Sequence, residues 1–208
     1  MRFVAISDTH GKHQFELPAG DVILHAGDVS SRGHKAEVQR FLDWFAGLDY
    51  RYKIFIAGNH DFFFETATQT EIEAMIPEGL IYLNDSGVEI EGIKIWGSPI
   101  QPWFYDWAFN RRRGPDIQKH WDLIPEDSDI VITHGPVFGI LDRTASGQVV
   151  GCEDLLPVIQ RIAPKVHLCG HIHEAYGTRQ VGDTLFINAS ILDLRYTIAH
   201  DPVVFDVY

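Results

Sequence analysis

Residues 52–61 read YKIFIAGNHD, an apolar run that ends in the polar cluster Gly58-Asn59-His60-Asp61. A short apolar run bounded by turn residues predicts a buried strand, here over Tyr52–Ala57. The glycine that follows permits a tight turn where the strand ends. We therefore expect the Asn, His and Asp side chains to lie at the carboxyl end of a strand.

The segments upstream of this strand supply the rest of a folding unit. His34–Gly47 carries apolar residues near helical spacing and ends at a glycine, which predicts a helix. Two earlier apolar runs, Arg2–Ser7 and Asp21–His25, predict further strands. The order strand, helix, strand is typical of a βαβ unit and predicts an α/β fold.

The segments downstream continue to mix strand and helix patterns. A helix is expected near Thr70–Met75, closed by Pro77. Leu80–Trp96 is expected to form an antiparallel meander that turns at Asp85-Ser86-Gly87 and at Glu91-Gly92. The remaining expected elements are a helix at Cys152–Ala163 and strands at Asp129–Thr133, Val166–Cys169, Tyr176–Val181, Thr184–Asn188 and Val203–Val207. Together these elements predict two packed sheets with helices outside.

Length and composition indicate one globular domain over residues 1–208. Hydrophobic residues make up 45% of the chain and charged residues 22%, close to the average for soluble domains. No apolar run approaches the roughly 18 residues that cross a bilayer. Arg2 places a charge before any apolar signal segment can form. We therefore expect a cytoplasmic protein.

The chain is acidic and poor in cysteine. Lys and Arg number 17 against 29 Asp and Glu, which gives a formal net charge of −12. This sign opposes binding to a nucleic-acid backbone or an anionic membrane, so we expect neither bulk nucleic acid nor a membrane as a partner. The only cysteines, Cys152 and Cys169, exclude a disulfide framework or a zinc site built from thiolates.

Polar clusters follow five of the expected strands. They are Asp8-Thr9-His10, Gly27-Asp28, Gly58-Asn59-His60-Asp61, Thr133-His134-Gly135 and Gly170-His171-Ile172-His173. Any one of them alone is compatible with an ordinary strand-end cap or turn. Because the carboxyl ends of strands in open α/β sheets converge on one ligand site, the whole set predicts a metal centre.

The ligand types indicate which metals fit. Imidazole and carboxylate without thiolate suit divalent Mn, Fe, Ni, Co or Zn ions. The donors outnumber the needs of one ion, which favours two ions that share a carboxylate. Such a pair can polarise a phosphoryl group and ionise a water. The sequence contains no phosphate-binding loop, dinucleotide-binding fingerprint or serine-hydrolase elbow, so these other chemistries find no support.

The order D-x-H, G-D, G-N-H-D, T-H-G and G-H-x-H, from Asp8 to His173, resembles that of the calcineurin-like metallophosphoesterases. A closer resemblance, to the small metallophosphoesterase-domain-containing group, comes from the context of Phe55–His60, Gly97–Pro99 with Gln101-Pro102, Trp107–Asn110 and Thr133–Pro136. The resemblance implies a four-layer α/β/β/α sandwich. It also implies hydrolysis of phosphate esters by in-line attack of a metal-bridging hydroxide.

The resemblance further implies a role for each motif residue. The metal ligands would be Asp8, His10 and His173 for the first ion, Asn59, His134 and His171 for the second ion, and Asp28 as a bridge between both. His60 would donate a proton to the leaving oxygen, and Asp61 would orient or tune His60.

The expected activity is that of a phosphodiesterase on small phosphate esters, nucleotide-like ones among them. A phosphomonoesterase, including a protein Ser/Thr phosphatase, is the alternative, because the same metals serve both reactions. A non-catalytic metal-binding scaffold is a third reading. The presence of all seven ligands together with His60 favours an enzyme over that scaffold.

Two arginines are candidate substrate contacts. Arg32 lies in Gly-Asp-Val-Ser-Ser-Arg-Gly, a spacing that resembles a phosphate-contacting motif of the phosphoprotein phosphatase branch. Arg113 ends the basic run Arg111–Arg113, which follows an aromatic stretch. The segment 96–113 would either form a lid that stacks a nucleobase and pairs a phosphate, or consist of core aromatics followed by arginines at a solvated helix start.

Overall fold

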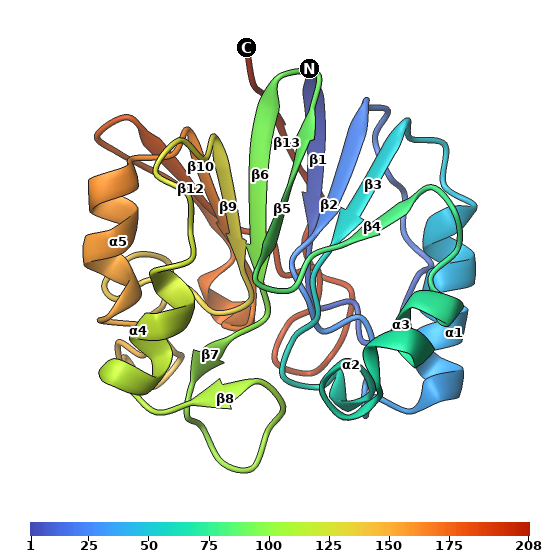
Figure 1. Cartoon of the computed structure of the whole chain (residues 1–208), viewed down its shortest axis with the longest axis horizontal. Helices are drawn as coiled ribbons and strands as arrows, with labels where there is room; N and C mark the ends of the chain where they lie inside the picture. The colour runs from blue at the N-terminus through green and yellow to red at the C-terminus, as the bar shows by residue number, and fades with distance from the viewer.

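The computed structural model describes residues 1–208 and consists of two large sheets packed against each other, with helices on both outer faces (Figure 1). The first sheet has five strands in the order β13-β1-β2-β3-β4. Its strands are β1 (Arg2–Ile6), β2 (Val22–His25), β3 (Tyr52–Phe55), β4 (Leu80–Tyr82) and β13 (Val203–Asp206). All of them are parallel except β13, which pairs antiparallel with β1. Its outer face is covered by α1 (Lys35–Ala46), α2 (Phe62–Thr66) and α3 (Gln69–Met75).

The second sheet has six strands in the order β11-β12-β10-β9-β6-β5. Its strands are β5 (Ser86–Ile90), β6 (Ile93–Ser98), β9 (Ile130–Thr133), β10 (Val166–Cys169), β11 (Gly177–Val181) and β12 (Thr184–Asn188). The four inner strands are parallel, and the two edge strands are antiparallel to their neighbours. The outer helices are α4 (Pro115–Trp121) and α5 (Leu155–Ile162), and the smaller elements are the pair β7 (Gln101–Pro102) and β8 (Asn110–Arg111) and the 3-10 turn η1 (His173–Ala175).

Alternate residues of the strands face different layers. In β1, Phe3 and Ala5 belong to the same buried cluster as Ile132 of β9, which places them between the sheets. Val4 of β1 belongs instead to a cluster that contains Phe41 of α1. Because successive strand residues point to opposite faces, one strand serves both the inter-sheet core and the core beneath a helix. The four-layer α/β/β/α sandwich expected from the sequence is confirmed.

Two features differ from the sequence-based expectation. Leu80–Trp96 is not a single meander, because β4 pairs in parallel with β3 in the first sheet, whereas β5 and β6 form a hairpin in the second. The chain crosses between the sheets near Asp85, which has a positive φ of 46°. The expected turn at Glu91-Gly92 is present, with φ values of 47° and 80° that suit a tight hairpin. The helix α2 and the pair β7–β8 were not expected, whereas α4 begins just after the arginines that one reading placed at a helix start.

The parallel strands of both sheets end on one side of the molecule, the lower side in Figure 1, opposite the two chain termini. At this end the sheets are joined. Ser7, which follows β1, forms a parallel bridge with Ser190, which follows β12, and the backbone N–H of Ile191 donates to the Ser7 carbonyl at 3.0 Å. No helix of the fold is both long enough and apolar enough to cross a bilayer.

Candidate metal centre

The polar clusters at the strand ends converge where the sheets join. Three groups of side chains have ligand atoms that all lie within 4.8 Å of one another. They are Asp8, His10 and His173; Asp28, His134 and His171; and His10, Asp28 and His60. Asp28 belongs to two of these groups, and its Oδ2 lies 3.6 Å from His10 Nε2 and 3.4 Å from His134 Nε2. The carboxylate of Asp28 therefore occupies the middle of the site.

Several of these residues adopt a backbone conformation that L-amino acids disfavour. Asp8, His10, Asp28 and His171 have positive φ values of 54°, 44°, 55° and 67°. Residues other than glycine rarely adopt positive φ, and such strain concentrates at functional sites. The turn after each strand thus directs its side chain inward at a cost in backbone energy.

Two glycines let the strand ends approach closely. A Cβ on Gly58 would lie 2.3 Å from Asp28 Oδ1 and 2.7 Å from His134 Cε1. A Cβ on Gly170 would lie 2.1 Å from Asp8 Oδ2. Because these separations are far below van der Waals contact, only glycine allows the carboxylates to stand where they do.

The imidazole rings are oriented through their Nδ1 atoms. Nδ1 of His134 bonds the Ala26 carbonyl at 2.9 Å, and Nδ1 of His173 bonds the Asp193 carbonyl at 3.1 Å. Each bond fixes the ring so that Nε2 faces the centre, the arrangement in which a histidine is held for metal binding. His10 is held in the same way by a bond of 3.2 Å from Nδ1 to a backbone carbonyl, and its buried Nε2 has no hydrogen-bond partner. A buried ring nitrogen without a hydrogen-bond partner is free to bind a metal ion.

The charges of the site fit a cation. Asp8 and Asp28 are buried. Burial raises the pKa of Asp28, but the neighbouring imidazoles, His134 foremost, lower it more, so that it falls below its ordinary range. Burial lowers the pKa of His134 and of His173, yet the carboxylates of Asp28 and Asp8 respectively raise each to about 9. Protons on these two imidazoles therefore balance the two carboxylates, a role that divalent ions would take over with release of the protons.

Asn59 and His171 complete the side of the site that lies around His134. The Asn59 side chain is buried, and its Oδ1 lies 2.9 Å from His134 Nε2. The His171 ring lies edge-on to His134 at a centroid distance of 5.0 Å, and burial lowers its pKa to about 4. A neutral imidazole is the form that binds a metal. The structure thus brings together all seven residues expected to be ligands.

His60 lies beside this set, close to Asp28. Its Nε2 is 4.0 Å from Asp28 Oδ2, and its Nδ1 lies 2.7 Å from the Ser31 carbonyl. One face of its ring rests on Trp107 at a centroid distance of 4.2 Å. These contacts fix the ring with Nε2 toward the centre.

Asp61, which was expected to orient or tune His60, does not hydrogen-bond to its ring. Its carboxylate is buried and accepts hydrogen bonds from the backbone N–H groups of Gly58, Val29 and Ser30 and from the Ser30 hydroxyl, and it makes no bond to the His60 ring. Burial raises its pKa to about 6, helped by the charge of Asp28 and opposed by these hydrogen bonds. Asp61 therefore ties the loop after β2 to the loop after β3, and the Ser31 carbonyl is what orients His60.

Residues at the end of β12 and beyond it support the site, and the sequence analysis did not identify them. The Ser190 hydroxyl donates to Asp8 Oδ2 at 2.8 Å, and the Asn188 side chain donates to the carbonyls of Gly170 and Ile172. The Tyr196 ring lies 4.9 Å from that of His10. The signal was present, because Asn188 and Ser190 place polar side chains at the end of an apolar strand and directly beyond it.

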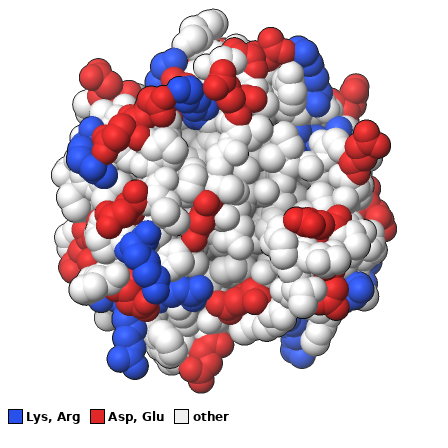
Figure 2. All heavy atoms as spheres, viewed as in Figure 1, with Lys and Arg blue, Asp and Glu red and all other residues white.

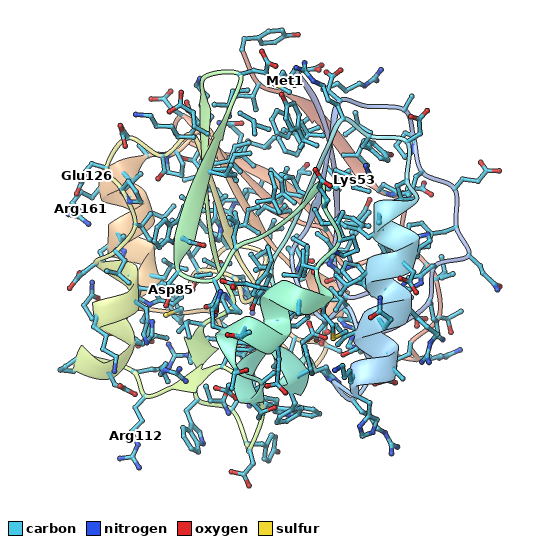
Figure 3. The ribbon with its side chains drawn as sticks, turned by 45° about the vertical axis from the view of Figure 1, so that its right-hand side comes forward. Met1, Lys53, Asp85, Arg112, Glu126 and Arg161 are labelled. Carbon is cyan, nitrogen blue, oxygen red and sulfur yellow. The ribbon has the colours of Figure 1, made fainter.

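The two candidate substrate arginines lie on different sides of the centre. Arg32 lines a groove with His10 and His60, and Arg113 lines another with His171. The rest of the basic run does not point into the site: Arg111 pairs with Glu65 at 3.4 Å, and Arg112 projects away from the molecule (Figure 3).

The aromatic stretch of the segment 96–113 divides between the two expected outcomes. Phe109 is buried in the core. Trp103, Phe104 and Tyr105 are exposed by 57%, 49% and 74% at the turn between β7 and β8. The segment therefore contributes both core residues and an exposed aromatic turn.

The fold and the site define an α/β sandwich with a candidate two-metal centre at the carboxyl ends of its strands. The sequence profile described as calcineurin-like phosphoesterase matches residues 1–175, and the chain belongs to that family. Divalent metal ions are the general cofactors of this family, and the ligand groups described above fit them.

Similar proteins agree with this placement. "Metallophosphoesterase domain-containing protein 1" of Homo sapiens is 41% identical in an alignment that covers 99% of this chain and 71% of that protein. A "Probable cyclic nucleotide phosphodiesterase" of Synechococcus is 30% identical over 161 residues, which cover 75% of this chain and 59% of that protein. A solved structure that is only 17% identical has a TM-score of 0.69 and covers 98% of both chains, which shows a shared fold.

Proposed function

We propose that residues 1–208 form one catalytic domain that hydrolyses small phosphate diesters with two divalent metal ions. The observation that carries this proposal is the convergence of seven ligand-type side chains around the shared carboxylate of Asp28, with His60 beside them. A scaffold would need neither the strained backbone of four of these residues nor the close approach at Gly58 and Gly170.

The residues divide into two sets of ligands that share one carboxylate. Asp28 contributes to both sets, and the others are Asp8, His10 and His173 for the first ion and Asn59, His134 and His171 for the second ion. Mn, Fe, Zn, Ni or Co ions bound there would neutralise charge on the phosphoryl oxygens and act as Lewis acids on water. The hydrogen bonds to Nδ1 of the histidines hold the rings for this purpose before any ion binds.

His60 supplies the proton for the leaving oxygen. In its protonated form Nδ1 donates to the Ser31 carbonyl, and Nε2 carries the second proton toward the centre. Because the ring packs against Trp107 and is fixed by this bond, the proton is presented at one place. A positioned acid contributes roughly 10²–10⁴-fold to such a reaction.

Two observations favour a small diester over other esters. The similar Synechococcus protein carries the name of a phosphodiesterase that acts on cyclic nucleotides. The net charge of −12 disfavours long nucleic acids, and Figure 2 shows basic side chains interspersed with acidic ones on the face that it draws. A small nucleotide-like diester agrees with both observations, because it is a phosphodiester and is not a long nucleic acid.

The test is metal-dependent hydrolysis of a chromogenic phosphodiester and its matched monoester, with metal content measured on the same sample. We expect diester turnover with about two metals per chain, as for a two-metal site, and none from Asp28→Ala. A large preference for the monoester would make the protein a phosphomonoesterase. Two bound metals without turnover of either ester would favour a scaffold, and failure to bind divalent metal would overturn the proposal as a whole.

A further inference from the structure

Two grooves adjoin the centre, and they border different ligands. A groove of about 490 Å³ contains His10 and His60, with Trp107 and Tyr196 among its lining residues. A second groove of about 480 Å³ contains His171 but neither His10 nor His60. Both volumes are in the range that holds a small organic group. The centre therefore has room for a substituent on each side of a phosphate.

The position of His60 indicates which groove holds the leaving group and which holds the group that stays on phosphorus. In an in-line displacement the attacking and the leaving oxygen lie on opposite sides of phosphorus. A leaving oxygen that takes its proton from His60 carries its substituent into the groove that His60 lines. The groove beside His171 is then the place for a substituent that stays on phosphorus.

The walls of this second groove are aromatic on one side. Trp103 and Phe104 line it, although both are about half exposed to solvent. The Phe104 ring is perpendicular to the His171 ring, at an interplanar angle of 87° and a centroid distance of 6.2 Å. Large aromatic side chains that are exposed next to a site often form part of a ligand-binding surface. The aromatic wall thus begins directly at a proposed metal ligand.

The turn that carries these aromatics is held in place. The buried side chain of Asn110 donates to the carbonyls of Phe104 and Tyr105 at 3.1 Å and 2.8 Å. The backbone N–H of Trp103 donates to the Arg111 carbonyl at 2.8 Å. Because these hydrogen bonds already fix the backbone of the turn, little conformational entropy is lost when a ligand binds to it.

The lining of this groove also contains a cation. Residues 148–152 form another part of the lining, and the Arg113 guanidinium donates from Nη2 to the carbonyls of Val150 and Gly151 at 3.3 Å and 3.1 Å. The remaining N–H groups of this guanidinium make no bond within the protein. A planar guanidinium that lines the same groove as aromatic rings favours a flat, electron-rich group that stacks and accepts hydrogen bonds.

We propose that the groove between residues 101–104 and 148–152 binds the ester group that remains on phosphorus, and that this group is a planar aromatic or heteroaromatic ring. The inference rests on the proposed function. In the reaction, water adds its oxygen to phosphorus and releases one proton to solvent, the bond from phosphorus to the leaving oxygen breaks, and protonated His60 gives its proton to that oxygen. The ring in the groove keeps its bond through oxygen to phosphorus, so the products are an alcohol and the phosphate monoester of the retained ring.

The test compares two diesters with the same leaving group, phenyl 4-nitrophenyl phosphate and methyl 4-nitrophenyl phosphate, on the metal-loaded full chain. We expect Trp103→Ala to lower kcat/KM for the phenyl ester by about tenfold, a modest share of the stacking energy of one ring. The methyl ester should change by less than about twofold, because a methyl group offers no ring to stack. The matched control is Tyr105→Ala, which removes a more exposed aromatic side chain of the same turn that does not line the groove.

Equal losses on the two esters, or no loss on either, would overturn the inference while leaving the proposed function intact. A wild-type protein that cleaves neither ester would contradict the proposed function instead. The groove assignment is then tested by binding alone. In calorimetry, phenyl phosphate should bind more tightly than methyl phosphate to the wild-type protein. This difference in affinity should be lost in Trp103→Ala. An unchanged advantage would refute the groove assignment with no reference to turnover.

Discussion

Replacement of Ser190 by alanine should weaken the binding of one metal ion and spare the other. Ser190 is fully buried, and its hydroxyl donates to Asp8 Oδ2 at 2.8 Å. Asp8 keeps its contacts with the backbone N–H of His171, at 3.0 Å and 3.1 Å, but loses its only hydroxyl donor. The hydroxyl makes no bond to any side chain proposed for the second ion.

The magnitude follows from the kind of bond that is lost. A hydrogen bond to a charged group contributes roughly 1.5–3 kcal/mol. Loss of a partner that orients a metal ligand weakens metal binding by roughly 10–100-fold, and a tenfold change corresponds to about 1.4 kcal/mol, so the two estimates agree. We therefore expect the first ion to bind about 10–100-fold more weakly in Ser190→Ala.

The assay is a titration of the metal-free protein with Mn²⁺ or Zn²⁺ by calorimetry, with metal content measured after dialysis. Ser7→Ala is the matched control, because Ser7 is also fully buried but its hydroxyl contacts only the Gly27 carbonyl, at 3.4 Å. Equal weakening of both ions, or an effect of Ser7→Ala as large as that of Ser190→Ala, would refute the reasoning.

Four further variants test the site and the core. His60→Ala should lower turnover by roughly 10²-fold or more and leave metal content near wild type, and loss of both metals would show that His60 is a ligand. Asp28→Asn should weaken both ions together in a metal titration, and selective loss of one would exclude a shared ligand. Gly58→Ala should abolish binding of two metals, because its Cβ would lie 2.3 Å from Asp28 Oδ1. Gly47→Ala is the control and should bind metal normally, because the atoms nearest to its Cβ would lie 3.5 Å away. Burial lowers the pKa of His167 to about 3, so its contribution to the free energy of unfolding is full above about pH 6.5 and is lost as the pH falls toward 3. His167→Gln should therefore reduce the loss of stability between pH 7 and pH 5 in urea unfolding by about 2 kcal/mol, and an unchanged loss would contradict this pKa.

The sequence was most informative where local patterns carry the structure. The strands that end in polar clusters are short apolar runs, and the residues after them must meet because parallel strands end on one side of a sheet. This reasoning located the seven candidate ligands and His60 without any knowledge of distances. It works because both the strand and its terminal cluster are contiguous in sequence.

Other features depend on contacts between distant segments. β4 could not be assigned to its sheet, because its apolar pattern is the same whether it pairs with β3 or with β5. α2 has three successive phenylalanines, Phe62–Phe64, and so shows no helical period. The role of Asp61 depends on a loop that lies 32 residues earlier in the chain, which adjacency to His60 does not reveal.

The join between the two sheets has a consequence for the lifetime of the protein. Each proposed ion takes ligands from both sheets, the first from Asp8 after β1 and His173 after β10, the second from Asn59 after β3 and His134 after β9. An ion present at about 100 times its Kd would add about 2.7 kcal/mol to the free energy of unfolding. The metal-free protein would therefore unfold more often at this end, and proteases would cleave its exposed loops. The metal supply would then determine the abundance of the protein as well as its activity.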